Sequence, residues 1–230
     1  PFNRDILYIL AEECSKNGLK LGLYYSLLDS YTSYYKDDER FAELIFLQIN
    51  ELLNNYGEIV ELWVDGFWEK QSSGWNLSPT DFVLAWRNEG AFRLKMDYLY
   101  RNIKEWQPEC IVLNDATNDF VGIPLHPVEA RSGVNVSYVV VDEKFWEWQG
   151  RESYFPLEIT MNLSGKDSGK FNPGNWYWHE DDESCPEQER IYRWLELAGR
   201  HEANLVLNCS ISPEGSLRNV DKQLLESLWH

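Results

Sequence analysis

The order of apolar runs and amphipathic segments constrains the fold of this 230-residue chain more than any other feature. Short runs rich in Leu, Ile and Val are typical of buried strands, and the segments between them carry apolar residues at helical spacing. The first expected elements are a helix at 3–16, a strand at 20–27, a helix at 41–56, a strand at 58–65, a helix at 92–106 and a strand at 110–115. Strands that alternate with helices predict a parallel sheet with helical crossovers.

The pattern loosens after residue 116 and returns near the C-terminus. The later expected elements are strands at 136–141 and 157–161, a helix at 187–200, a strand at 203–208 and a helix at 219–229. We therefore expect an α/β protein with a single domain over residues 1–230, closed into a (β/α)8 barrel. A doubly wound open sheet is the alternative, but no glycine-rich phosphate-binding loop follows any expected strand.

Charge and composition exclude several classes of partner. The net charge of −17 disfavours nucleic acid and anionic membrane surfaces, because both require clustered Lys and Arg. No apolar run is long enough to be inserted across a bilayer. The four histidines and four cysteines show no metal-ligand spacing, so we expect no structural zinc.

Aromatic side chains are abundant, with 11 Trp, 13 Tyr and 10 Phe. Several tryptophans lie in stretches that we interpret as loops: Trp68, Trp75, Trp146, Trp148, Trp176 and Trp178. Flat apolar rings with a polar edge suit partly hydroxylated ligands such as sugars. The alternative is that these rings pack beneath long loops.

An acidic residue ends an apolar strand in ELWVDGFW, residues 61–68. An ionised carboxylate there must be solvated, hydrogen-bonded or paired. One interpretation is that Asp65 caps the strand and opens a turn with Gly66. The other is functional, because the neighbouring expected strands also end in polar residues: Tyr24 and Tyr25 before it, and Asn114 and Asp115 after it. Since the carboxyl ends of barrel strands form the site, we expect these side chains to share one cleft.

Four segments carry a resemblance to a known family. In chain order they are GLKLGLYYSLLDSY (18–31), NNYGEIVELWVDGFW (54–68), CIVLND (110–115) and ANLVLNCSISPEGSL (203–217). Together they resemble glycoside hydrolase family 29, the retaining α-L-fucosidases. The resemblance spans most of the chain. It implies a (β/α)8 catalytic domain that needs no metal or organic cofactor.

The resemblance also implies roles for individual residues. Asp65 corresponds to the nucleophile that attacks the anomeric carbon of fucose. Trp63 corresponds to a residue that lines the sugar pocket, and Tyr24 to the strand tyrosine beside it. We expect further substrate contacts from residues near the same strand ends: Tyr25, Trp68, Asn114 and Asp115.

A retaining glycosidase needs a second carboxyl group about 5 Å from the nucleophile, which acts first as acid and then as base. Glu129 in HPVEARSG falls at about the family's position for this group. Glu158 in FPLEITMN resembles a second family glutamate and is the alternative. For either residue, the other interpretation is a solvated loop glutamate.

The chain departs from the family pattern in two places. Ala116 stands where the family carries an arginine that contacts the sugar. The family's first two barrel strands would precede residue 1, and a barrel without them has two unpaired edges. We therefore expect a partial barrel, which is completed by a missing N-terminal segment or a second copy unless the chain has lost its activity.

These observations predict a retaining glycoside hydrolase that removes terminal α-L-fucose from glycans through a covalent glycosyl-aspartate intermediate. The alternatives are a non-catalytic sugar-binding or assembly module derived from the same fold, and a retaining glycosidase for another sugar. The expected partner is a fucosylated glycan or oligosaccharide. We expect an extracytoplasmic location, because polymeric glycans lie mostly outside the cytoplasm.

Overall fold

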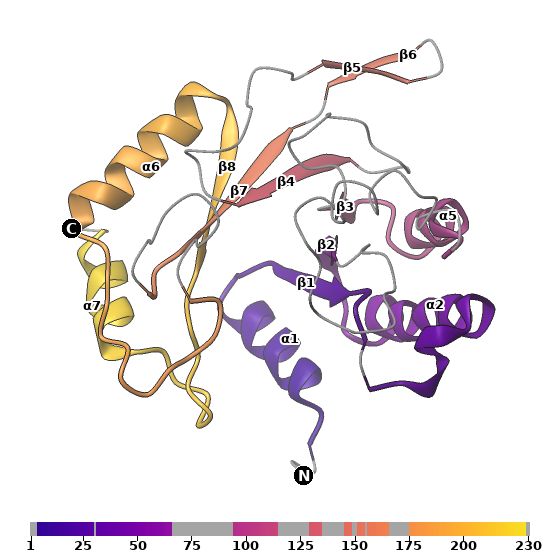
Figure 1. Ribbon diagram of the computed structural model, residues 1–230, viewed down its shortest axis with the longest axis horizontal. Coiled ribbons are helices and arrows are strands. Elements are labelled where there is room, and N and C mark those ends of the chain that lie inside the picture. Colours follow the sequence, from indigo (N-terminus) through magenta and orange to yellow (C-terminus); the bar gives the residue numbers. More distant parts are fainter. Residues whose placement is uncertain are drawn as a thin grey trace. The chain divides into compact units, whose positions relative to one another are not determined.

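The computed structural model describes residues 4–29, 31–65, 94–114, 129–134, 145–148, 151–154, 156–165 and 175–228 (Figure 1). The chain divides into two compact units. Unit 1 comprises Pro1–Thr117 and Ile123–Ala130, and unit 2 comprises Asn118–Gly122 and Arg131–His230. The single-domain organisation and the closed (β/α)8 barrel remain predictions.

Unit 1 alternates helices and strands as the sequence predicts. Its elements are α1 (Ile6–Lys16), β1 (Leu21–Ser26), the 3-10 helix η1 (Ser33–Lys36), α2 (Asp38–Asn55), β2 (Ile59–Asp65), α5 (Met96–Trp106) and β3 (Ile111–Asn114). Strand β2 pairs in parallel with β1 on one side and with β3 on the other. The expected α/β class with parallel strands is confirmed for this unit.

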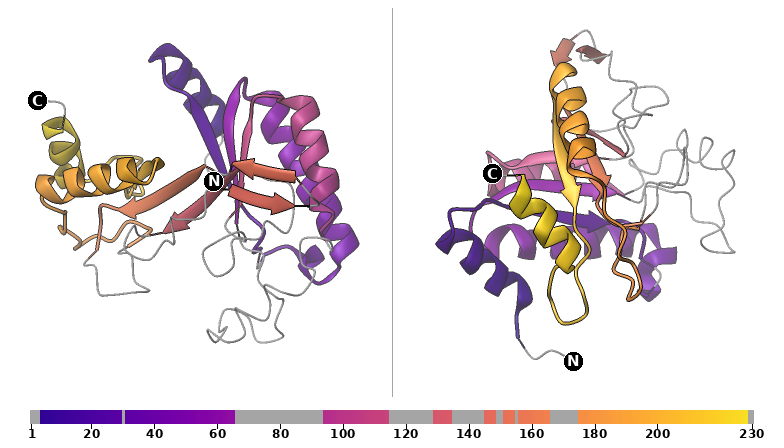
Figure 2. Two further views of the ribbon diagram at one scale, coloured as in Figure 1. Left: turned by 90° about the horizontal axis from the view of Figure 1, so that it is seen from above. Right: turned by 90° about the vertical axis from the view of Figure 1, so that its left-hand side faces the viewer.

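The core of unit 1 lies between these strands and the two helices α2 and α5, which run side by side (Figure 2). Helix α2 buries one stripe at helical spacing: Phe41, Ala42, Ile45, Ile49 and Leu53. Strand β2 contributes Leu62 and Val64 to the same core, and both are fully buried. Since strand side chains alternate between faces, Trp63 and Asp65 lie on the other face of β2.

Local sequence sets the ends of the helices in unit 1. The carboxylates of Asp5 and Asp37 accept backbone N–H bonds in the first turns of α1 and α2, as N-cap residues do. Gly18 and Gly57 follow these helices with φ of 69° and 80°, a left-handed conformation that glycine adopts without a steric penalty. Both glycines follow the helix ends that the sequence predicts at residues 16 and 56.

Unit 2 contains the later elements of the chain. They are β4 (Ala130–Val134), β5 (Phe145–Trp148), β6 (Arg151–Tyr154), β7 (Leu157–Asn162), α6 (Gln188–Arg200), β8 (Ala203–Asn208) and α7 (Asn219–Ser227). Strand β7 pairs in parallel with β4 and with β8, and β5 and β6 form an antiparallel pair. Helix α6 packs against β7 and β8 through Trp194 and Leu197.

A buried ion pair joins the start of α7 to the rest of unit 2. The Arg218 guanidinium donates from Nε and Nη2 to the two oxygens of Asp221, over 2.9 and 2.6 Å. It also donates to the backbone carbonyls of Asp182 and Leu163, over 2.7 and 3.2 Å. Arg218 and Asp221 are almost fully buried. The pair therefore fixes α7 to two loops that are distant in sequence.

The structure also departs from the expected elements. The strand expected at 136–141 lies outside the described residues, and β4, β5 and β6 were not expected. Trp146 and Trp148, which we interpreted as loop residues, belong to β5 instead. No helix within the described ranges combines the length and apolar character that crossing a bilayer requires.

The stripe on α2 allows a matched test of the core in unit 1. Ile49 is fully buried, whereas Leu47 on the same helix is 57% exposed. We expect Ile49→Ala to lower the free energy of unfolding by about 2–5 kcal/mol, because it leaves a cavity. Leu47→Ala should change it by about 0.5 kcal/mol or less. Urea denaturation measures both, and equal effects would contradict the described packing.

The ion pair at α7 gives a second test. Asp221→Ala removes the carboxylate that binds two nitrogens of the buried Arg218 guanidinium and leaves only the Asp182 carboxylate, 3.5 Å from Nη1. We expect a loss of about 3 kcal/mol of unfolding free energy. Glu196→Ala removes a carboxylate from the exposed pair with Arg200 on α6 and serves as the control. The control substitution should lower the free energy of unfolding by about 1 kcal/mol or less. A small effect at Asp221 would show that this pair does not anchor α7.

Candidate functional site

The candidate site in unit 1 is built on the carboxyl ends of β1 and β2. Their register places Tyr24 opposite Trp63 and Ser26 opposite Asp65. Beyond the last pair, the Leu27 N–H donates to the Asp65 carbonyl over 2.7 Å, which continues the strand pairing by one bond. The backbone of Asp65 is therefore held to β1 by the strand pairing.

A hydrogen bond connects the two central side chains of the site. The Tyr24 hydroxyl donates to Oδ2 of Asp65 over 2.7 Å. The Tyr24 ring meets the Trp63 indole edge to face, with ring centroids 5.3 Å apart. Such ring pairs contribute about 0.5–1.5 kcal/mol beyond the area they bury. The carboxylate is thus oriented by a phenol that is itself oriented by an indole.

Trp63 carries a donor that no described residue pairs with. Its Nε1 atom is buried and has no hydrogen-bond partner among the described residues. An indole N–H can only donate, and an unpaired buried donor costs about 1–3 kcal/mol. Unpaired buried groups are rare in folded proteins and call for an explanation. A ligand oxygen beside Asp65 would supply the missing acceptor.

Tyr25 does not join this group, although the sequence analysis placed it there. Its ring packs against the core on the helix side of β1, and its hydroxyl donates to Oε1 of Gln48 on α2 over 2.6 Å. Burial, together with nearby Asp29, raises the Tyr25 pKa well above its ordinary value. Since adjacent strand residues point to opposite faces, Tyr24 and not Tyr25 reaches Asp65.

Glu129 lies in unit 1, directly before β4, and its carboxylate is already engaged. Oε1 accepts a bond from Lys104 Nζ over 2.7 Å, and Oε2 accepts one from the Val112 N–H over 2.9 Å. The Glu129 N–H in turn donates to the Val112 carbonyl. Burial, followed by the Glu129 carboxylate, raises the pKa of the neighbouring Tyr100. These contacts make Glu129 an anchor between α5 and β3.

The register of the strands also separates Glu129 from Asp65. Val112, which binds both the carboxylate and the N–H of Glu129, lies opposite Leu62 of β2. Asp65 follows Leu62 by three residues, which is about 10 Å along a strand. A retaining glycosidase needs about 5 Å between its two carboxyl groups. The structure does not bring Glu129 to Asp65, and this geometry does not favour its predicted acid/base role.

The remaining predicted residues are placed as follows. Glu158 is the second residue of β7 in unit 2, is buried, and accepts a bond from Asn204 Nδ2 over 2.7 Å. Asn114 is the last residue of β3, opposite Val64. The side chain of Asn114, together with Trp68 and Asp115, lies outside the described residues. The acid/base role of Glu158 remains a prediction.

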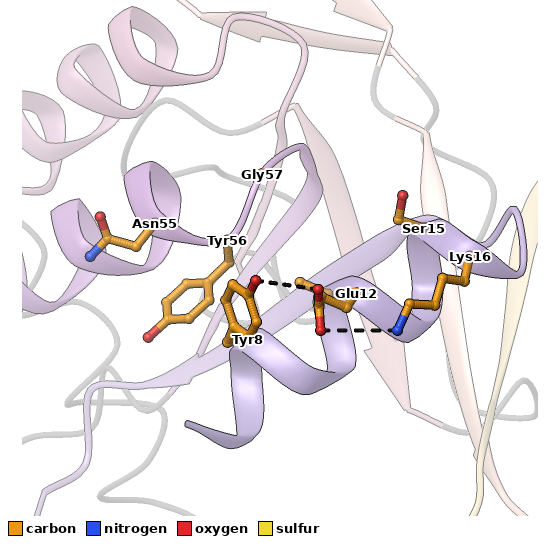
Figure 3. A pocket seen from close by; sticks show the side chains of 8 residues that line it. Tyr8, Glu12, Ser15, Lys16, Asn55, Tyr56 and Gly57 are labelled. Atoms are coloured by element: carbon orange, nitrogen blue, oxygen red, sulfur yellow. Dashed lines mark hydrogen bonds and ion pairs between the residues drawn. The ribbon is translucent and has the colours of Figure 1, made fainter. Parts of the chain in front are cut away.

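A groove of about 330 Å³ lies at the other end of β2, between α1 and the turn after α2 (Figure 3). Its side chains bind one another. The Tyr8 hydroxyl donates to Glu12 over 3.2 Å, and Lys16 Nζ lies 4.0 Å from the same carboxylate. These exposed pairs do not resemble a site for a specific ligand, and the groove is far along β2 from Asp65.

Comparison with known proteins gives a consistent result. A model of the family described as alpha-L-fucosidase matches residues 1–229. Alpha-L-fucosidase 1 from Arabidopsis thaliana is 22% identical over 238 residues, which cover 96% of this chain and 40% of that protein. The chain therefore spans less than half the length of this relative.

Solved structures show the same fold. Alpha-L-fucosidase isoenzyme 1 from Paenibacillus thiaminolyticus aligns with a TM-score of 0.71 and 20% identity, over 99% of this chain and 52% of that one. An alpha-L-fucosidase from Lactobacillus casei, in complex with its α-L-fucose product, aligns with a TM-score of 0.64 and 22% identity, over 99% and 64% of the two chains.

The contacts of Glu129 predict a structural effect of its loss. Glu129→Ala leaves Lys104 Nζ and the Val112 N–H without the carboxylate, and we expect the free energy of unfolding to fall by about 1–3 kcal/mol. Glu105→Ala, on the exposed side of α5, is the control and should have little effect. Urea denaturation compares the two, and unchanged stability of Glu129→Ala would contradict the anchoring role.

Proposed function

The chain belongs to the α-L-fucosidase family, and from this premise we propose that it hydrolyses terminal α-L-fucose from fucosylated glycans with retention of configuration. The observation that carries the proposal is the position of Asp65. It ends a parallel strand, its carboxylate accepts a bond from Tyr24 over 2.7 Å, and the unpaired indole donor of Trp63 lies on the same face of the strand. A nucleophile, an orienting group and a ligand donor are thus adjacent.

In this mechanism, a carboxylate oxygen of Asp65 attacks the anomeric carbon while the bond to the aglycone oxygen breaks. A covalent glycosyl-aspartate forms, and water then attacks the same carbon to release fucose and restore the carboxylate. The Tyr24 hydroxyl fixes the rotamer of Asp65 before attack, which lowers the entropic part of the barrier. The Trp63 N–H donates to an oxygen of the bound sugar.

The departing aglycone oxygen must receive a proton from a second carboxyl group. Glu129 and Glu158 stay the two candidates for this group, although Lys104 and Val112 bind the first and the second lies at the amino end of β7. The parallel order of β1, β2 and β3 supports the (β/α)8 barrel as part of this proposal. An extracytoplasmic location fits glycan substrates.

The first test is hydrolysis of 4-nitrophenyl α-L-fucoside. We expect Asp65→Asn to lower kcat by at least about 10³-fold, because the amide cannot form the covalent intermediate. Tyr24→Phe should lower kcat by a smaller factor, since it removes only the orienting bond. Asp181→Asn, an exposed aspartate in unit 2, is the matched control and should retain full activity.

Chemical rescue separates the nucleophile from a merely structural residue. In Asp65→Gly, added azide should attack the anomeric carbon, expel 4-nitrophenolate and give fucosyl azide of inverted configuration. Full activity of Asp65→Asn would refute the assignment. If the wild type binds the fucoside but shows no turnover, the non-catalytic sugar-binding alternative becomes the better account.

A further inference from the structure

Strand β7 is buried on both faces, and one face is apolar while the other is polar. Leu157, Ile159 and Met161 pack with residues of α6. Strand alternation places Glu158, Thr160 and Asn162 on the opposite face, and all three are also buried. A sheet face that carries three consecutive buried polar side chains is unusual for a core and needs a reason beyond packing.

The neighbouring strand β8 satisfies part of this polar face. Its register with β7 places Asn204 opposite Glu158 and Asn208 opposite Asn162. Asn204 Nδ2 donates to Glu158 at the amino end, and Asn208 Nδ2 donates to Oδ1 of Asn162 over 2.8 Å at the carboxyl end. Two amide side chains therefore meet at the carboxyl ends of adjacent parallel strands.

The contacts of Asn208 determine which way the Asn162 amide faces. Asn208 Nδ2 also donates to the Trp176 carbonyl over 3.2 Å, so both of its hydrogens are used. A flipped Asn208 would present an oxygen to that carbonyl, which is unfavourable. Oδ1 of Asn162 must consequently face Asn208, and its Nδ2 atom points elsewhere.

Two donors on this face have no partner within the described part of the chain. They are Nδ2 of Asn162 and Oγ1 of Thr160, and the two residues are only 7% and 2% exposed. Leaving such groups unpaired opposes folding, so they call for an acceptor that the described residues do not supply. Since Nδ2 is closed to solvent, binding requires the side chains around it to give way.

The segment bound to this amide pair identifies the class of ligand. Asn175 is fixed to Ser164 by two bonds, from Ser164 Oγ to the Asn175 carbonyl over 2.6 Å and from the Asn175 N–H to the Ser164 carbonyl over 2.9 Å. The next two residues carry exposed rings, with Trp176 38% and Tyr177 81% exposed. Exposed rings in the segment whose backbone carbonyl binds Asn208 suit a pyranose, which has apolar faces and hydroxyl edges.

We propose that Asn162 is a saccharide-binding residue of unit 2, whose Nδ2 atom donates to a sugar oxygen while Asn208 holds its orientation and Trp176 supplies ring surface. This inference rests on the proposed function, because the saccharide is the fucosylated ligand. Asn162 acts in binding and takes no part in bond cleavage.

Calorimetric titration with 4-nitrophenyl α-L-fucoside tests the proposal, in the Asp65→Asn protein so that the ligand stays intact. The further substitution Asn162→Ala should raise Kd by about 10-fold, because it removes one buried hydrogen bond to the sugar. Asn208→Ala should also weaken binding, because it frees the Asn162 amide to rotate. Asn204→Ala, the equivalent amide at the amino end of β8, is the control and should alter the melting temperature but not Kd.

A second measurement needs no substitution at Asn162 or Asn208. The Asp65→Asn protein is labelled with 15N-asparagine, and the side-chain amide signals of Asn162 and Asn208 are followed during titration with the fucoside. Shifts of these signals at saturation support the contact. Unshifted signals, or an unchanged Kd in Asn162→Ala despite binding in the parent, overturn this inference and leave the proposed function intact. A parent that binds no fucoside overturns both.

Discussion

Parallel pairing of β1 with β2 is the constraint on which the site in unit 1 depends. Residues in register on parallel strands share a face, so a single register brings Tyr24 to Trp63 and its hydroxyl to Asp65. A slip of β1 by one residue would turn Tyr25 toward Asp65 instead. That slip would also move the leucines of β1 away from the core against α2 and α5. Hydrophobic burial on one face of the strand thus specifies the polar geometry on the other.

Side chains also alternate between the two faces of the strands in unit 2, but there both faces of a strand are buried. Its strand β7 buries polar side chains as well as apolar ones, and the amides of β8 satisfy only some of them. Two of the buried donors that lack a partner among the described residues, Trp63 Nε1 in unit 1 and Asn162 Nδ2 in unit 2, are each a cost to the free protein. Natural sequences tolerate such local conflicts mainly where a ligand resolves them. At these positions, the groups that we propose to bind a ligand lower the stability of the free protein.

Much of the fold could be predicted because helical and strand periodicity are local, and the polar end of an apolar strand made Asp65 the candidate nucleophile. The face of Tyr25 was also predictable, since alternation alone separates it from Tyr24. The anchoring of Glu129 was not, because it depends on Lys104, a contact across 25 residues. Strand β4, ARSGV, has no alternating pattern to read. Asn162 was overlooked although it ends an apolar strand just as Asn114 does.

The bonds of Arg218 have a consequence for how unit 2 is assembled. Its guanidinium binds carbonyls that lie 36 and 55 residues earlier in the sequence. Contacts of such separation form late, since the intervening chain must first be ordered. During synthesis, β7 and its polar face therefore emerge well before the residue that completes their surroundings. Until Arg218 has left the ribosome, the loop after β7 lacks one of its fixing bonds, and this half of the chain depends longest on protection from aggregation.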